Sequence, residues 1–343
     1  MKFYKLYSLC IFVGILLIIA CKKDKGVINP KEWKAYPINE IKTYSDSSYY
    51  FGRIINSTEY NDIIVLNDNK FNRAILYDTS LQFKRIIGGE GKGPKEFGKL
   101  SGNPIIDKNY IYLYDLTTNK IKIFKKNGKY YESINYPLPA GEDFIHFDYC
   151  KDTNNNFYSS SYLKDKPIIK FSQKGNILNE FGEFIPSINM KHKRVLNYRH
   201  TIVTQDNKII TVNIRNPRIK IFSDNGELIA QYNYNNFFDY YIESVNKRIK
   251  KSKKNKFKRP ILFRDTYYKN NRLYLLYWGH KYGEHPFSSQ VAVFLIDNNQ
   301  LYFEKVINLQ TDTGKGSFST ICVLNNKLIA FDVLSGNILV YKI

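Results

Sequence analysis

The sequence predicts an all-β protein, a six-bladed β-propeller closed by an N-terminal strap strand. Three observations lead to this fold class: the composition, a repeat of about 47 residues, and a blade that lacks its last strand. The 343 residues include 29 tyrosines and 23 phenylalanines but only two methionines and two tryptophans. Aromatic and β-branched residues suit pleated, half-buried surfaces, so the composition favours strands.

One pattern recurs along the chain: an apolar strand, a turn, and a second strand that ends in an aromatic residue. Ile111–Asp115 leads in this way to Ile121–Phe124, and Ile209–Val212 leads to Ile219–Phe222. The aromatic residues that mark the repeat are Tyr77, Phe124, Phe171, Phe222, Phe294 and Tyr341, with spacings of 47, 47, 51, 72 and 47. Periods near 40–50 residues with several short strands are typical of propeller blades, so six markers predict six blades.

The two irregularities of the repeat have separate explanations. An insertion over 235–260 accounts for the spacing of 72. Tyr341 lies two residues from the C-terminus, which leaves no sequence for the outermost strand of the last blade. The segment Trp33–Ile41 can supply that strand and so remove exposed sheet edges, which makes 33–343 the propeller. A β-sandwich, or a pair of them, is the alternative, but it does not predict regular spacing.

The N-terminus predicts a lipoprotein signal peptide over 1–20. Lys2 and Lys5 precede the apolar run Leu9–Ala20, which is short for a transmembrane helix and suitable for a signal sequence. The residues before Cys21 resemble a lipobox, so we expect Cys21 to carry the lipid, including palmitate, that anchors the chain. An uncleaved anchor with an incidental cysteine is the alternative.

The residues after the cysteine predict a hydrophilic tether over 21–32 and a location in the cell envelope. Lys22 follows Cys21 where an inner-membrane retention signal would have aspartate, so the outer membrane is favoured over the inner membrane. Removing the signal peptide, with its two lysines, lowers the net charge from +21 to +19. The remaining cysteines, Cys150 and Cys322, lie in apolar strand-like segments that are far apart in the repeat. Two free thiols are therefore expected rather than a disulfide.

A family resemblance appears at Arg85–Phe97, followed by Pro104–Asp107 and Ile111–Asp115. These segments resemble the signature between blades of NHL-like six-bladed propellers, in particular the bacterial lipoproteins of that kind. The resemblance covers essentially the whole mature chain and implies the fold rather than an activity. The loop Gly88–Gly98 lacks the Gly-Lys-Ser/Thr ending of a phosphate-binding loop, so we expect it to carry the chain between blades.

Candidate binding residues lie where the innermost strands should begin. Those starts are expected near Phe51, Pro104, Phe144, Tyr198, Leu262 and Phe318. The candidates are Arg53, His146, Arg199, His200 and Arg264, with Asp265 beside them. This set is rich in cations and would suit an anionic ligand at the channel mouth, because arginine pairs bidentately with carboxylate or phosphate. The alternative is that these residues form hydrogen bonds at the surface or between blades.

A second candidate surface is Lys247–Arg259, in which nine of thirteen residues are basic. The patch includes Lys250, Lys251, Lys253 and Lys254. It could contact the headgroups of a membrane or an anionic glycan, or it could be a solvated loop. Nucleic acid is not expected as a partner, because the protein is exported and carries no nucleic-acid-binding motif.

The sequence contains no GxSxG, HExxH or paired-carboxylate motif, and it offers no cluster of metal ligands. We therefore expect no cofactor and no metal. The expected function is a non-enzymatic binding or scaffold module of the envelope, for an anionic ligand or a protein partner. Resemblance to NHL-like propellers keeps an envelope hydrolase or lactonase as the alternative.

Overall fold

The computed structural model describes residues 31–42, 51–138, 148–161, 163–186, 193, 196–239, 242–243, 261–278 and 288–343. Residues Met1–Pro30 form a separate unit from Lys31–Ile343, and the fold below is that of the second unit. Among the described residues, no helix is long and apolar enough to cross a membrane.

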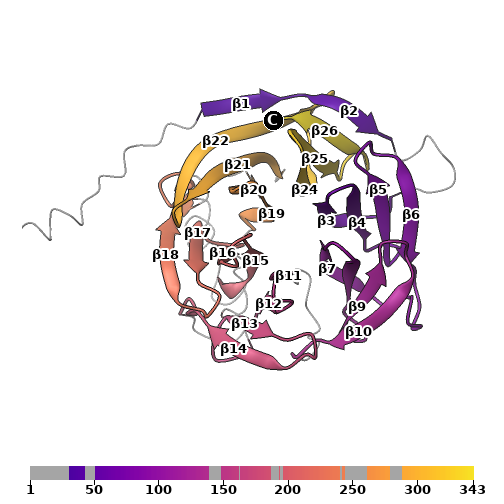
Figure 1. Ribbon diagram of the computed structural model, residues 1–343. Coiled ribbons are helices and arrows are strands. Elements are labelled where there is room, and N and C mark those ends of the chain that lie inside the picture. The colour runs from indigo at the N-terminus through magenta and orange to yellow at the C-terminus, as the bar shows by residue number, and fades with distance from the viewer. Residues whose placement is uncertain are drawn as a thin grey trace, which may run out of the picture. The chain divides into compact units, whose positions relative to one another are not determined.

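Six sheets surround a central axis as the blades of a propeller, which confirms the predicted fold (Figure 1). The innermost strands of blades one to six are β3 (Ile54–Tyr60), β7 (Leu100–Ile106), β11 (Tyr149–Lys151), β15 (Arg199–Val203), β19 (Phe263–Lys269) and β24 (Phe318–Leu324). The second strands are β4 (Ile63–Asp68), β8 (Tyr110–Asp115), β12 (Phe157–Ser160), β16 (Ile209–Asn213), β20 (Arg272–Trp278) and β25 (Lys327–Asp332).

The third and outermost strands complete each blade. The third strands are β5 (Arg73–Asp78), β9 (Lys120–Lys125), β13 (Ile168–Phe171), β17 (Arg218–Phe222), β21 (Ser288–Asp297) and β26 (Ile338–Lys342). The outermost strands are β6 (Phe83–Gly88), β10 (Tyr130–Asn135), β14 (Ile177–Phe181), β18 (Leu228–Asn233), β22 (Gln300–Thr311) and β2 (Pro37–Ile41). Blade five also contains β1 (Lys31–Ala35) and the short β23 (Gly314–Lys315).

The six aromatic markers all lie on third strands, and all six are buried. Third strands are covered by neighbouring blades on both faces, so alternate residues pack into different cores. Phe124 of β9, for example, packs against Leu76 and Phe97 in the core between blades one and two. The repeat is therefore visible in the sequence because each blade places one large ring at the same point.

A buried polar residue recurs nine positions before the marker in four blades, at the end of the second strand. These residues are Asp68, Asp115, Asn213 and Asp332. The Asp68 carboxylate accepts hydrogen bonds from the backbone N–H of Gly52 (2.9 Å) and Arg53 (2.8 Å). Asp332 accepts one in the same way from Ser317 (2.9 Å). Each carboxylate thus fixes the chain where it enters the innermost strand.

The glycine-rich loop connects the outermost strand of blade one to the innermost strand of blade two, as predicted. Gly88 adopts φ +84°, and a Cβ there would lie 2.3 Å from the Phe97 ring, so only glycine fits. The buried ammonium of Lys122 donates hydrogen bonds to the carbonyl oxygens of Gly93 (3.1 Å) and Glu96. It also pairs with Asp115 at 3.0 Å. The loop is therefore a structural connection between blades.

The strap closes the propeller but is divided between two blades. β2 pairs antiparallel with β26 and supplies the missing outermost strand, as predicted. β1 instead pairs in parallel with β22 of blade five, so the assignment of all of Trp33–Ile41 to the last blade was wrong. β22 is twelve residues long. Without β1, its outer edge would have no pairing strand. Figure 1 shows β1 and β2 along the rim, over β22 and β26.

Candidate functional site

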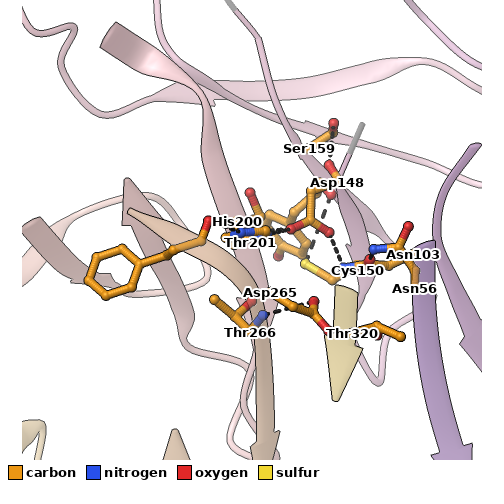
Figure 2. Close-up of polar contacts among 12 residues, drawn as sticks. Asn56, Asn103, Asp148, Cys150, Ser159, His200, Thr201, Asp265, Thr266 and Thr320 are labelled. Atoms are coloured by element: carbon orange, nitrogen blue, oxygen red, sulfur yellow. Dashed lines mark hydrogen bonds and ion pairs between the residues drawn. The ribbon is translucent and has the colours of Figure 1, made fainter. Parts of the chain in front are cut away.

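The centre of the propeller contains a ring of six polar side chains, one from each blade. The members are Asn56, Asn103, Asp148, His200, Asp265 and Thr320 (Figure 2). Five lie on innermost strands, and Asp148 directly precedes β11. Because the six side chains lie at matching positions around the axis, residues of four different types can interact with their neighbours there.

One half of the ring centres on the Asp148 carboxylate. Asn56 Nδ2 donates to Asn103 Oδ1, and Asn103 Nδ2 donates to Asp148 Oδ1. The other carboxylate oxygen, Oδ2, lies 2.8 Å from His200 Nδ1 and accepts a bond from the Thr201 backbone N–H (3.3 Å). Blades one to four are therefore connected by consecutive side-chain hydrogen bonds, which Figure 2 shows around Asp148.

The other half of the ring centres on the Asp265 carboxylate. Its Oδ2 accepts bonds from the Thr320 hydroxyl (2.6 Å) and the Ile321 backbone N–H (2.8 Å). Thr320 Oγ1 lies 2.8 Å from the hydroxyl of Ser57, which follows Asn56 on β3 and returns the network to blade one. Asp265 and His200 are linked through their charges, since each affects the pKa of the other.

Burial sets the ionisation of the ring. It raises the pKa of Asp265 to about 6, although the charge of His200 and the bonds from Thr320 and Ile321 oppose that rise. Burial alone would lower the pKa of His200, but the hydrogen bond and charge of Asp148 outweigh it and raise that pKa above 6.5. Asp148, His200, Asp265 and Thr320 are all buried, so this level of the channel is packed on their side.

Beyond the ring, the channel opens into a cavity of about 760 Å³, which we call the mouth pocket. Its walls are the carboxyl-terminal ends of the innermost strands of blades one to five and the turns that follow. The lining segments are Ser57–Asn61, Asn103–Asn109, Tyr149–Thr153, Thr201–Gln205 and Thr266–Asn270, with Asn155. A volume of this size falls in the range of roughly 300–1,000 Å³ that is usual for small-molecule sites.

Ion pairs between blades hold the walls of the mouth pocket. Tyr267 donates its hydroxyl to Glu59 Oε1 at 3.0 Å, and the Lys269 ammonium binds the same oxygen. Both residues belong to blade five and reach Glu59 on blade one, so they cover blade six on this side of the channel. Lys151 pairs with Asp107 at 2.7 Å and connects blades three and two.

Three buried polar atoms at the mouth pocket have no hydrogen-bond partner among the described residues. They are Glu59 Oε2, Thr201 Oγ1 and Thr266 Oγ1. The side chain of Glu59 is only 6% exposed, and Thr201 and Thr266 are 2% and 6% exposed. Leaving such a group unsatisfied costs about 1–3 kcal/mol.

The predicted candidates occupy different places. His200 is in the ring, whereas Arg53 and Arg264 precede the ring residues of their strands and lie at the opposite end of the channel from the mouth pocket. Burial, and then the charge of Arg53, lower the pKa of Arg264. His146 lies outside the described residues.

Arg199 does not join the other two arginines. It is buried, and its guanidinium donates to the Glu183 carbonyl (2.7 Å) and to Asn197 Oδ1 (3.2 Å). Burial and the nearby charge of Arg218 lower the pKa of Arg199 to about 10. The lipidation site Cys21 and the patch of Lys250, Lys251, Lys253 and Lys254 lie outside the described residues.

Sequence reasoning missed Asn56, Asn103, Asp148 and Glu59. No single signal marked the ring, because several innermost strands begin with more than one polar residue, as in Arg199–Thr201 of β15. The two remaining cysteines are free thiols, as expected. Among the described residues, no three His, Cys, Asp or Glu side chains gather as a metal site would require.

Comparisons with known proteins agree with the architecture. The family DUF5128, described as a 6-bladed beta-propeller, matches residues 45–330. A Bacteroides fragilis protein described as exported is similar in structure (12% identity, TM-score 0.56, 87% of each chain covered). So is a DUF4221 family member from Bacteroides vulgatus (10% identity, TM-score 0.54, 91% of this chain and 96% of that chain).

Another similar structure is the catalytically inactive virginiamycin B lyase of Staphylococcus aureus with quinupristin (12% identity, TM-score 0.51, 89% of this chain and 98% of that chain). At such identities, the likeness concerns the fold alone. No curated protein matches the sequence significantly.

Proposed function

The chain belongs to the 6-bladed beta-propeller family DUF5128, and on that premise we propose that it is an exported lipoprotein that acts as a non-enzymatic binding module. A propeller scaffold hosts many functions, so the proposal depends on the site rather than on the fold. The ligand occupies the mouth pocket, and the lipid on Cys21 holds the disc at the membrane.

The mouth pocket is the observation that carries this proposal. It is a cavity of about 760 Å³ whose lining includes Asn103 of the polar ring and whose walls are held by ion pairs between blades. Polar side chains from five blades line it. A preformed cavity of this size with convergent polar groups is the arrangement expected of a small-molecule site.

The envelope location is supported by the N-terminal sequence. Cys21 ends an apolar run that Lys2 and Lys5 precede, and the Bacteroides fragilis propeller is described as exported. Several acyl chains on one cysteine would anchor the protein stably, because each buried methylene adds about 0.8 kcal/mol. The outer membrane is the expected destination.

An anionic ligand or a protein partner is proposed for the other end of the channel. Arg53 and Arg264 lie close enough there for one charge to lower the pKa of the other, as adjacent guanidiniums that bind carboxylate or phosphate do. The basic segment Lys247–Arg259 is a further surface for anionic glycans or lipid.

A hydrolase or lactonase is the second candidate, and the His200–Asp148 pair is the observation that favours it. A carboxylate that orients an imidazole is a common general base. Here, however, His200 is buried and both of its nitrogens are engaged, because Nε2 lies 3.4 Å from the Phe263 carbonyl oxygen. Binding is therefore preferred over catalysis.

Capture of small molecules from the cell envelope tests the binding function. Purified protein and the pocket-filling variant Ser57→Trp would be incubated with an envelope extract, washed and denatured, and the released molecules identified by mass spectrometry. We expect the unaltered protein to enrich a small molecule that the variant does not. Equal release from both proteins would argue against a ligand in the mouth pocket.

A further inference from the structure

We propose that the propeller stands edge-on to the membrane, with the strap (residues 31–42) and the adjoining β25–β26 turn in contact with the lipid surface. This inference rests on the proposed lipid anchor at Cys21 and adds the orientation of the anchored disc. Three observations support it: exposed apolar side chains concentrate at the strap, the tether joins the disc there, and the side chains suit a lipid–water interface.

The strap exposes three large apolar or aromatic side chains. Trp33, Tyr36 and Ile38 are 42%, 63% and 56% exposed. Tyr36 lies between β1 and β2 and belongs to neither strand. Ile38 is the extra residue of a β-bulge, since it lies between two residues that pair with consecutive positions of β26. A bulge redirects a side chain out of the regular pleat, so this part of the strap presents apolar surface to the outside.

A second exposed apolar segment adjoins the strap. The β25–β26 turn carries Val333 and Leu334, which are 50% and 63% exposed, and Asn337 of the same turn donates a hydrogen bond to Glu40 of β2 (2.5 Å). We call these two residues, with the three of the strap, the strap surface. Among the described residues it holds five of the twelve exposed large apolar or aromatic side chains, and the other seven are spread over blades one to five. Such a concentration indicates an interaction site, whereas single exposed residues do not.

The route of the chain makes the lipid surface the partner of the strap surface. Lys31, the first residue of β1, pairs with Lys305 on the outer edge of blade five, so the tether joins the disc at its rim and not at either end of the channel. Ten residues separate Cys21 from Lys31, and they span at most about 35 Å. The strap is therefore the part of the propeller that directly follows the anchor and is held within this distance of the bilayer.

The side chains of the strap suit the boundary between lipid and water. Tryptophan and tyrosine are enriched at the headgroup level of membranes, because each combines an apolar ring with a polar group. The ammonium of Lys305 lies 4.7 Å from the centre of the Trp33 ring, so a cation accompanies the ring. The strap also has three exposed lysines against two glutamates, and its charge is therefore compatible with anionic headgroups.

The edge-on orientation has a consequence for the binding site. A disc lying flat on the membrane would press one end of its channel against the headgroups. A disc that contacts the membrane through its rim leaves the mouth pocket and the opposite channel end open to the aqueous phase. Ligands dissolved in the envelope can then reach either end.

Quenching of tryptophan fluorescence by brominated lipid measures this orientation. The chain has only two tryptophans, so Trp278→Phe leaves Trp33 as the sole reporter. The lipidated protein would be reconstituted on vesicles of phosphatidylcholine and phosphatidylglycerol, with and without bromine on acyl carbons near the headgroup. The matched control adds Trp33→Phe and Tyr131→Trp, which moves the reporter to a position of 49% exposure on β10 of blade two, across the disc from blade five.

We expect bromine to lower the fluorescence of Trp33 at least about twofold and to leave the blade two reporter unchanged, because only the strap reaches the interface. Adding Tyr36→Ser and Ile38→Ser to the Trp33 reporter should remove most of the quenching, since these substitutions take away apolar area that holds the rim in the lipid. Leu228→Ser with Ile229→Ser, on exposed side chains of β18, is the control for that change and should leave the quenching as it was.

Sedimentation of the same vesicles separates this inference from the anchor on which it rests. If the protein sediments with the vesicles but neither reporter is quenched, or both are quenched equally, the edge-on orientation is wrong and the anchor stands. Undiminished quenching after Tyr36→Ser and Ile38→Ser would likewise overturn the role of the strap surface. Protein that does not sediment with the vesicles would overturn the anchor and the orientation together. Ligand capture by the mouth pocket is measured independently of all these results.

Discussion

The imidazole Nδ1 of His200 lies 2.8 Å from Oδ2 of Asp148, and this buried pair connects the innermost strands of blades four and three. The same carboxylate accepts a bond from Asn103 of blade two. Three blades thus meet at one side chain, directly below the mouth pocket. The polar ring therefore acts as a connection between blades.

The ring should make stability depend on pH through His200. Its pKa is raised above the ordinary 6.5, so its contribution is fully present below pH 6.5 and is lost as pH rises through the folded-state value. His200→Gln should lower the free energy of unfolding by about 3 kcal/mol at pH 5.5 and by clearly less at pH 9. Urea unfolding at both pH values measures the difference.

The control for this experiment is Glu304→Gln, which breaks a partly exposed pair with Arg272. Because this pair is partly exposed, its loss should cost less than about 1 kcal/mol at each pH. An equal cost of His200→Gln at pH 5.5 and pH 9 would mean that folding does not shift the pKa of the imidazole, and would contradict the prediction.

The recurring carboxylate at the end of the second strand should be a large determinant of stability. Asp115 is fully buried, pairs with Lys122 at 3.0 Å and accepts a bond from the Thr118 hydroxyl at 2.8 Å. Asp115→Ala leaves the buried ammonium without its carboxylate, so we expect unfolding to become easier by about 3–5 kcal/mol. Denaturant titration measures the loss.

Lys84→Ala is the matched control, since Lys84 forms an exposed pair with Asp78. Exposed pairs contribute little, and this substitution should change stability by less than about 1 kcal/mol. Similar losses for the two variants would show that the repeated carboxylate does not fix the entry to the innermost strand.

The strap should keep the propeller monomeric. Deleting residues 31–42 removes β1 and β2 and exposes the edges of β22 and β26, which can then pair with another molecule. We expect dimers or aggregates in size-exclusion chromatography with light scattering, together with a lower melting temperature. Deletion of residues 22–30 is the control. It retains the strap, so we expect the elution volume and melting temperature of the full chain. An unchanged elution volume after loss of the strap would contradict its role.

The lipid anchor is tested at Cys21. Cys21→Ser should move the protein from the membrane fraction to the soluble fraction and abolish incorporation of labelled palmitate. Cys150→Ser leaves the anchor intact and serves as the control, because Cys150 is a free thiol within the propeller. Continued membrane sedimentation of Cys21→Ser would indicate an uncleaved apolar anchor instead.

The fold was predictable because each blade repeats the same packing arrangement. Tyr77, Phe124 and the other markers occupy one core position, and a large ring at a fixed spacing leaves a visible period in the sequence. The strap was predictable in part, since only two residues follow the last marker, Tyr341, and they cannot form the outermost strand of the last blade. Its division between two blades was not, because nothing in the sequence of Lys31–Ala35 specifies pairing with the long β22.

The site was harder to predict because its members differ in chemistry and come from distant segments. Asp148 and His200 are 52 residues apart, and Glu59 and Lys269 are 210 apart. Only the closed ring of blades brings them together. Arg199 illustrates the converse difficulty. Its charge suggested a ligand site, whereas its guanidinium donates a hydrogen bond to the backbone carbonyl of Glu183.

A high-resolution crystal structure of the protein purified from its own envelope, without added ligand, tests the central claim most directly. The account predicts density for a small molecule in the mouth pocket, in contact with residues of its lining from several blades. A pocket that holds only water in this structure would contradict it.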